Sequence, residues 1–158
     1  MQIGIVGLGR MGANMARRLA RGGAAVIAYD SDKAAPEALK GEKGVACVES
    51  LAALAARLAG ERVVLAMLPA GAPTGDTLAE LLPMLSAGDT LVDGGNAFYK
   101  DSMARALELS QRGLRYIDAG VSGGIHGLAN GYCLMLGGTP KSIEIFEPYA
   151  RILAPAPD

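Results

Sequence analysis

The sequence feature that most constrains this chain lies near its N-terminus, where Gly7-Leu8-Gly9-Arg10-Met11-Gly12 separates two patterned segments. The run before it, Gln2–Val6, is short and mostly apolar, and the run after it, Met11–Arg21, carries apolar residues at helical spacing. In a tight turn between a strand and a helix, the first glycine permits the turn and the second leaves room beside the backbone. The third lets the helix pack close to the strand. The segment therefore predicts a strand, a turn and a helix in that order.

Short β-rich runs and Ala/Leu-rich helical runs continue to alternate along residues 1–93, as is typical of a parallel sheet with helices on both faces. We expect strands at Gln2–Val6, Ala25–Tyr29, Val45–Cys47, Arg62–Met67, Thr90–Val92 and Arg115–Asp118. We expect helices at Met11–Arg21, Leu51–Leu58 with Ser50 as N-cap, Thr77–Leu85, Lys100–Arg112 and Lys141–Ile152. The predicted fold class is α/β, a Rossmann-type, doubly wound, mostly parallel sheet. One domain would span residues 1–153, and residues 154–158 would begin a linker.

Charge and composition exclude several classes of function. The chain has 158 residues, with 15 basic and 16 acidic side chains, which leaves it without the positive field of a nucleic-acid binder. No apolar run approaches the roughly 20 residues that cross a bilayer, so we expect no membrane partner and a cytoplasmic location. The two distant cysteines, Cys47 and Cys133, and the single histidine, His126, predict neither disulfides nor a metal site.

The glycine-rich turn also predicts chemistry, because a helix that begins there presents free backbone N–H groups and a partial positive charge. These features suit the diphosphate of a dinucleotide. We therefore assign the turn to cofactor binding, through Gly7, Leu8, Gly9, Arg10, Met11 and Gly12. The alternative is a glycine-rich turn that binds no ligand.

Asp30 ends the second expected strand, where a dinucleotide-binding fold places the carboxylate that accepts hydrogen bonds from the adenosine ribose. A carboxylate would repel a 2′-phosphate, so Asp30, with Ser31 beside it, predicts NAD in preference to NADP. Two observations weigh against this assignment. Asp30, Ser31 or Asp32 could cap the next helix, and Lys33 is close enough to soften a phosphate clash.

Two further turns follow expected strands at the edge of the sheet where ligands bind in open α/β folds. Leu68-Pro69-Ala70-Gly71 either forms a wall of the cofactor site, through Leu68, Pro69 and Ala70, or is ordinary loop sequence. Asp93-Gly94-Gly95-Asn96 brings an amide to the same edge, and we expect Asp93 to be structural. Asn96 could bond to the nicotinamide ribose or to a substrate hydroxyl, or it could cap the next helix.

The segment Gly120-Val121-Ser122-Gly123-Gly124 also follows a strand, and its hydroxyl and free N–H groups could hold a carboxylate. This would suit an acidic substrate, through Ser122, Gly123 and Gly124. The alternative is a bulge or a tight turn without a ligand. His126 lies nearby and is expected to be a surface or packing residue.

Taken together, these motifs resemble the cofactor domain of the 6-phosphogluconate dehydrogenases, within the wider β-hydroxyacid dehydrogenase family. Asn96–Ser102 and Gly131–Gly138 are similar to the NAD-preferring, decarboxylating branch. Two residues depart from the family pattern: Ala97 stands where a serine is common, and His126 where the NAD-type proteins have a bulkier aromatic residue.

The resemblance implies an NAD-dependent oxidoreductase that, at full length, oxidises 6-phosphogluconate to ribulose 5-phosphate and carbon dioxide. Asn96 would contact both the nicotinamide and the substrate, and Ser122, Gly123 and Gly124 would bind the carboxylate side of the sugar acid. The family's acid–base lysine and glutamate lie beyond residue 158, so this chain has no assigned catalytic residue. We expect the chain alone to bind NAD but turn over poorly, and the full-length protein to be a homo-oligomer assembled through an all-helical domain.

Two other functions stay open from the sequence. The same cofactor loops serve dehydrogenases or reductases of other small β-hydroxy acids, such as 3-hydroxyisobutyrate. A nucleotide-sensing module without catalytic activity would also use them.

Overall fold

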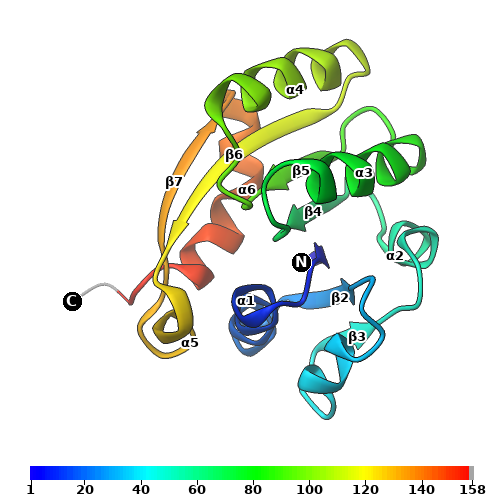
Figure 1. Cartoon of the computed structure of the whole chain (residues 1–158). Coiled ribbons are helices and arrows are strands. Elements are labelled where there is room, and N and C mark those ends of the chain that lie inside the picture. Colours follow the sequence, from blue (N-terminus) through cyan, green and yellow to red (C-terminus); the bar gives the residue numbers. More distant parts are fainter. Residues whose placement is uncertain (157–158) are drawn as a thin grey trace.

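The computed structural model describes residues 1–156, and within them seven strands form one sheet in the order β3-β2-β1-β4-β5-β6-β7 (Figure 1). Strands β1 to β6 are parallel, and β7 runs antiparallel to β6 at the edge of the sheet. The strands are β1 (Gln2–Val6), β2 (Ala25–Tyr29), β3 (Val45–Cys47), β4 (Val63–Ala66), β5 (Thr90–Asp93), β6 (Arg115–Ser122) and β7 (Cys133–Gly138). The α/β fold class expected from the sequence is confirmed.

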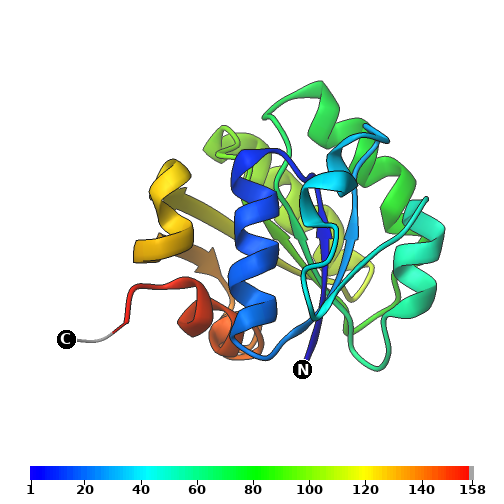
Figure 2. The ribbon, with the colours of Figure 1, turned by 90° about the horizontal axis from the view of Figure 1, so that it is seen from below.

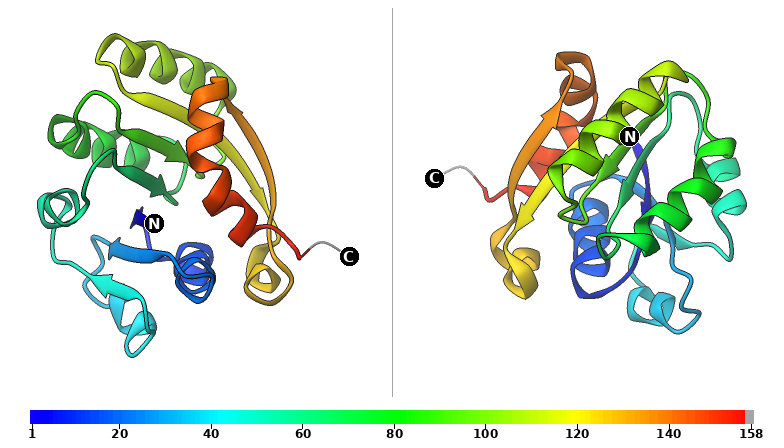
Figure 3. Two further views of the ribbon diagram at one scale, coloured as in Figure 1. Left: turned by 180° about the vertical axis from the view of Figure 1, so that it is seen from behind. Right: turned by 45° about the horizontal axis from the view of Figure 1, so that its top comes forward.

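Helices cover both faces of this sheet, and Figure 3 shows α6 on the face opposite to α3 and α4. The α-helices are α1 (Arg10–Arg21), α2 (Leu51–Arg57), α3 (Ala72–Leu81), α4 (Tyr99–Gln111), α5 (Gly127–Asn130) and α6 (Pro140–Leu153). Short 3₁₀ helices occupy Ala35–Leu39, Leu82–Met84 and Gly124–His126.

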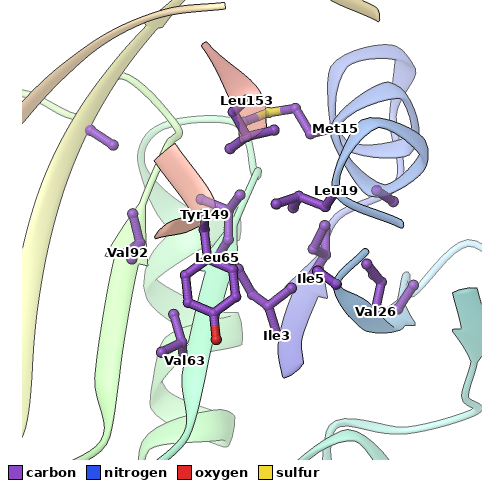
Figure 4. Close-up of a cluster of buried hydrophobic side chains, with 14 of the residues drawn as sticks. Ile3, Ile5, Met15, Leu19, Val26, Val63, Leu65, Val92, Tyr149 and Leu153 are labelled. Carbon is purple, nitrogen blue, oxygen red and sulfur yellow. The ribbon is translucent and has the colours of Figure 1, made fainter. Parts of the chain in front are cut away.

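Two hydrophobic cores lie on the two faces of the sheet, because successive side chains of a strand point to opposite faces. Ile3 and Ile5 of β1 pack with α1 and α6 in the first core, whereas Val6 belongs to the second core. Figure 4 shows the first core, in which Met15, Leu19, Tyr149 and Leu153 surround β1. The second core joins the sheet to α2, α3 and α4 through Leu54, Leu81 and Leu109. Burial of β1 on both faces explains its nearly continuous apolar sequence.

Several local expectations are confirmed. The Ser50 hydroxyl accepts a hydrogen bond from the Ala53 N–H at 3.0 Å and caps α2. Helix α1 buries Gly12, Ala13, Ala16 and two larger apolar side chains at helical spacing, so its apolar face meets the sheet.

The expected boundaries agree with the structure to within one residue, except those of α3 and β6. Helix α3 begins at Ala72, where Thr77 was expected, and Pro73 occupies its first turn, a position at which the missing N–H breaks no helical bond. Strand β6 continues to Ser122, beyond the expected Asp118, because its last residues pair with β7.

The carboxyl end of α6 lies close to α1. Arg18 donates hydrogen bonds to the carbonyls of Ile152 at 2.8 Å and Ala154 at 2.6 Å, which satisfies acceptors at the end of α6. Residues 157–158 of the expected linker lie outside the described residues, and the domain boundary at residue 153 stays a prediction.

Among residues 1–156, no helix combines the length and apolar character needed to cross a membrane. The same residues contain no cluster of three or more potential metal ligands.

Candidate cofactor site

The loops that follow β1, β2, β4 and β5 meet at the carboxyl edge of the sheet and line a cavity of about 670 Å³. Figure 2 shows β1 passing into the amino end of α1 at this edge, opposite the N-terminus. The chain order runs outward from β1 in both directions, since β2 lies on one side of β1 and β4 on the other. Open α/β sheets bind ligands in the crevice at such a topological switch point.

Two glycines of the opening turn are required by the fold. Gly7 has φ +95°, and a Cβ there would lie 2.4 Å from the Met67 carbonyl oxygen. A Cβ on Gly12 would lie 1.9 Å from the Gly7 carbonyl oxygen. Any side chain at either position would displace backbone.

Gly9 is different. Its φ of −56° is available to any residue, and a Cβ there would have no atom within 4 Å among the residues that the structure describes. Packing and backbone geometry therefore give no reason for glycine at this position. Gly9 borders open space at the start of α1, as expected where a ligand approaches the backbone closely.

The amino end of α1 has an exposed set of donors. Among residues 1–156, no side chain caps α1, and its first turn holds no acidic residue. Ser50 caps α2 and Thr139 caps α6, whereas in the described part of the chain α3, α4 and α5 begin without a side-chain cap, as α1 does. The first N–H groups of a helix have no intrahelical acceptor, and with the helix dipole they favour an anion. The space beside Gly9 can accept a diphosphate there.

Asp30 links the end of β2 to this turn. Its Oδ2 accepts the Leu8 N–H at 2.5 Å, and its Oδ1 accepts the Asp32 N–H at 2.8 Å. The next element is a 3₁₀ helix with Ala34 as its N-cap, so Asp30 does not cap it. A carboxylate offers about four acceptor sites, so Asp30 retains capacity for ligand hydroxyls.

Asp30 and Ser31 both line the main cavity, and both also line an adjoining cavity of about 330 Å³. Lys33 and Glu37 line this second cavity too, so charges of both signs lie near Asp30.

Asn96 enters the cavity on the turn between β5 and α4. It is exposed and has φ +54°, the only positive φ of a non-glycine residue within residues 1–156. The N-cap of α4 is Phe98, so Asn96 does not cap that helix. The preceding glycine is required by packing, because a Cβ on Gly95 would lie 2.4 Å from the Leu68 carbonyl oxygen.

A protein family described as the NAD binding domain of 6-phosphogluconate dehydrogenase matches residues 2–155. The chain belongs to this family. A relative from Haloferax volcanii, named 6-phosphogluconate dehydrogenase, NAD(+)-dependent, decarboxylating, is 36% identical over 100% of this chain and 52% of that protein. The chain spans about a third to a half of the length of the relatives it matches.

Solved structures show the same relationship. Plasmodium falciparum 6-phosphogluconate dehydrogenase, described with its cofactor NADP+ and its substrate 6-phosphogluconate, has a TM-score of 0.92 and 25% identity. The match covers 99% of this chain and 34% of that one. Mycobacterium tuberculosis 3-hydroxyisobutyrate dehydrogenase has a TM-score of 0.88 and 26% identity, over 97% of this chain and 52% of that one. The family thus includes NAD- and NADP-dependent proteins.

Most of the cofactor-site residues expected from the family motifs line the cavity, namely Gly7, Gly9, Arg10, Met11, Gly12, Asp30, Ser31, Leu68, Pro69 and Asn96. Leu8 is buried in the core, and its backbone N–H donates a hydrogen bond to Asp30, which lines the cavity. Ala70 is exposed but does not line the cavity.

The expected substrate residues Ser122, Gly123 and Gly124 lie outside this cavity. They are exposed at the end of β6, next to α5, which packs against α1. The structure therefore places them beside the cofactor domain's first helix but does not join them to the cavity.

Sequence reasoning missed three residues of α3 that line the cavity: Pro73, Asp76 and Thr77. They lie three and four positions apart, which places them on one helix face. We expected this helix to begin at Thr77, so the sequence did not show that these three residues share a helix face.

Proposed function

We propose that this chain is the cofactor domain of an enzyme that oxidises and decarboxylates 6-phosphogluconate, and that it prefers NAD to NADP. The observation that carries the cofactor part of the proposal is the unfilled space at Gly9 beside the uncapped amino end of α1. The substrate part is supported by the family match over residues 2–155. In this proposal the diphosphate bonds to the N–H groups of Arg10, Met11 and Gly12.

The preference for NAD rests on Asp30. Its carboxylate is fixed by two backbone N–H groups and faces the cavity, so it would accept bonds from ribose hydroxyls. A 2′-phosphate at that place would bring like charges together. Lys33 in the adjoining cavity offsets part of this repulsion, and relatives of both preferences exist. We therefore expect this chain to bind NAD more tightly than NADP but still to bind NADP.

The roles of the remaining site residues follow from the family resemblance. Bound NAD would supply the acceptor for a hydride from the carbon that carries the substrate hydroxyl. Asn96 would contact both the nicotinamide and the substrate through its amide, and Ser122, Gly123 and Gly124 would bind a carboxylate of the substrate. We assign the acid–base residues, and the contacts that assemble a homo-oligomer, to parts of the enzyme other than this chain. The cytoplasmic location stays a prediction.

A dehydrogenase of a small β-hydroxy acid is the second candidate, because the fold also matches a 3-hydroxyisobutyrate dehydrogenase. Assays of the full-length enzyme with 6-phosphogluconate and with 3-hydroxyisobutyrate separate the two. Release of carbon dioxide from the first substrate supports the proposal, and turnover of only the second overturns it.

Calorimetric titration of this chain with NAD+ and NADP+ tests the cofactor assignment. We expect NAD+ to bind more tightly, and Asp30→Asn to reduce the ratio of the two affinities about tenfold. Asp32→Asn is the matched control, since it removes the same charge from an exposed neighbour two residues away. Tighter binding of NADP+ to the unmodified chain would overturn the role of Asp30.

A further inference from the structure

A buried ion pair lies beneath the turn that carries Asn96. The Asp93 side chain, at the end of β5, is 1% exposed, and its Oδ2 accepts a hydrogen bond from Arg105 Nη1 at 2.7 Å. The Tyr116 hydroxyl donates to the same oxygen at 3.2 Å. The Asp93 Oδ1 accepts the Gly95 N–H at 3.0 Å. One carboxylate thus joins α4, β6 and the turn.

This carboxylate restrains the residue before Asn96. The left-handed backbone of a non-glycine residue is unfavourable, and it persists only where the surroundings hold it. Gly95 is held from two sides, by its N–H bond to Asp93 and by close packing against the Leu68 carbonyl. The direction in which Asn96 leaves the turn therefore depends on where Asp93 is fixed.

Arg105 supplies the only cation paired with Asp93 within residues 1–156. A buried carboxylate without a neutralising cation is strongly unfavourable, so loss of the guanidinium would make Asp93 turn toward water. That movement would weaken the bond to the Gly95 N–H. The Arg105 side chain itself does not line the cavity.

We propose that Arg105 is a positioning residue for the cofactor site, which acts through Asp93 to aim Asn96 into the cavity. This inference rests on the proposed function, because it requires that Asn96 contacts the bound dinucleotide. Arg105 matters for binding because it fixes the turn, while the ligand touches Asn96.

The structure offers a matched control at the other end of β5. Asp89 precedes that strand, is 3% exposed, and pairs with Arg62 Nε at 3.0 Å. Both arginines are similarly covered, with side chains 17% and 18% exposed. Of the two carboxylates, Asp93 bonds to a residue that lines the cavity, Gly95, whereas Asp89 bonds to none within residues 1–156. The two pairs therefore share a structural role and differ in their relation to Asn96.

The test is a double-mutant cycle on NAD+ affinity, measured by calorimetry on the chain. We expect Arg105→Met and Asn96→Ala each to weaken binding about tenfold, and the double variant to bind no more weakly than Asn96→Ala alone. Arg62→Met should lower the melting temperature but leave the affinity unchanged. Arg105→Lys, which keeps the charge, should restore part of the lost affinity and serves if Arg105→Met does not fold.

Three results would overturn the inference. The first is an unchanged NAD+ affinity in both Arg105 variants. The second is that Arg105→Met weakens binding as much in the Asn96→Ala background as in the unmodified chain, and the third is that Arg62→Met weakens binding as much as Arg105→Met does. Absence of any dinucleotide binding by the unmodified chain would instead overturn the proposed function, and this inference with it. The unmodified titration thus separates the two failures.

Discussion

Replacing Gly9 by aspartate should abolish most dinucleotide binding without unfolding the protein. Its backbone, with φ −56°, accepts any residue, and a Cβ would meet no atom within 4 Å among residues 1–156. Aspartate is a better N-cap than glycine, by a few tenths of a kcal/mol. The helix should therefore be as stable as before, while its first N–H groups bond to the new carboxylate.

The expected loss has two parts: the new side chain fills space that the diphosphate would occupy, and its charge repels the phosphate. The part due to charge can be worked out. Two unit charges 4 Å apart repel by about 1 kcal/mol in bulk water and by about 4 kcal/mol at the effective dielectric constant near a protein surface. Gly9 is exposed, so we take about 2 kcal/mol for a carboxylate beside a phosphate. This corresponds to roughly 30-fold weaker binding.

Calorimetry with NAD+ measures the affinity, and thermal unfolding checks the fold. Gly9→Asn is the matched control, because it caps the helix and fills the same volume without a charge. Its loss should be smaller than that of Gly9→Asp by the roughly 30-fold electrostatic factor. A folded Gly9→Asp variant with the affinity of the unmodified chain would refute the diphosphate assignment.

Three further predictions concern stability. Gly12→Ala should destabilise the fold by about 3 kcal/mol or more, since its Cβ would lie 1.9 Å from a carbonyl oxygen; an unchanged denaturation midpoint would contradict this. Tyr149→Phe should lose about 1 kcal/mol in urea unfolding, because the hydroxyl donates to the Gln2 carbonyl at 2.7 Å; a neutral effect would show that this bond contributes little. Burial raises the pKa of Tyr116, Tyr132 and Tyr149, so the folded state favours the neutral phenols. The contribution of these tyrosines to stability should be level up to their unfolded pKa near 10 and should fall as pH rises beyond it toward the raised folded values. Unfolding curves at pH 8 and 11 would reveal any opposite trend.

The sequence predicted the features that depend on local pattern. The glycine-rich turn, the alternation of strands and helices, and the Ser50 cap each rest on residues within a few positions of one another. Asp30 could be placed at the end of β2 for the same reason.

Features that depend on residues far apart in the sequence were harder to predict. The extension of β6 to Ser122 comes from pairing with β7, which the sequence pattern did not identify as its partner. The first turn of α3 contains Gly75, which disfavours a helix by propensity. Its buried Thr74 hydroxyl nevertheless donates to the Pro69 carbonyl at 2.7 Å, so tertiary contact stabilises the early start.

The ion pair between Arg105 and Asp93 also could not be predicted from the sequence. Asp93 was expected to be structural, but the sequence gives no sign that a residue on α4 returns to it. The partner could be found only once α4 was placed beside the turn.

In the proposed complex, the diphosphate of the dinucleotide binds at the amino end of α1. The most direct measurement is a titration of the ¹⁵N-labelled chain with NAD+, followed by the chemical shifts of its backbone amides. We expect the largest changes on Arg10, Met11 and Gly12, whose N–H groups begin α1 without a side-chain cap among residues 1–156. Saturable binding that leaves these three amides unchanged would contradict this placement of the diphosphate.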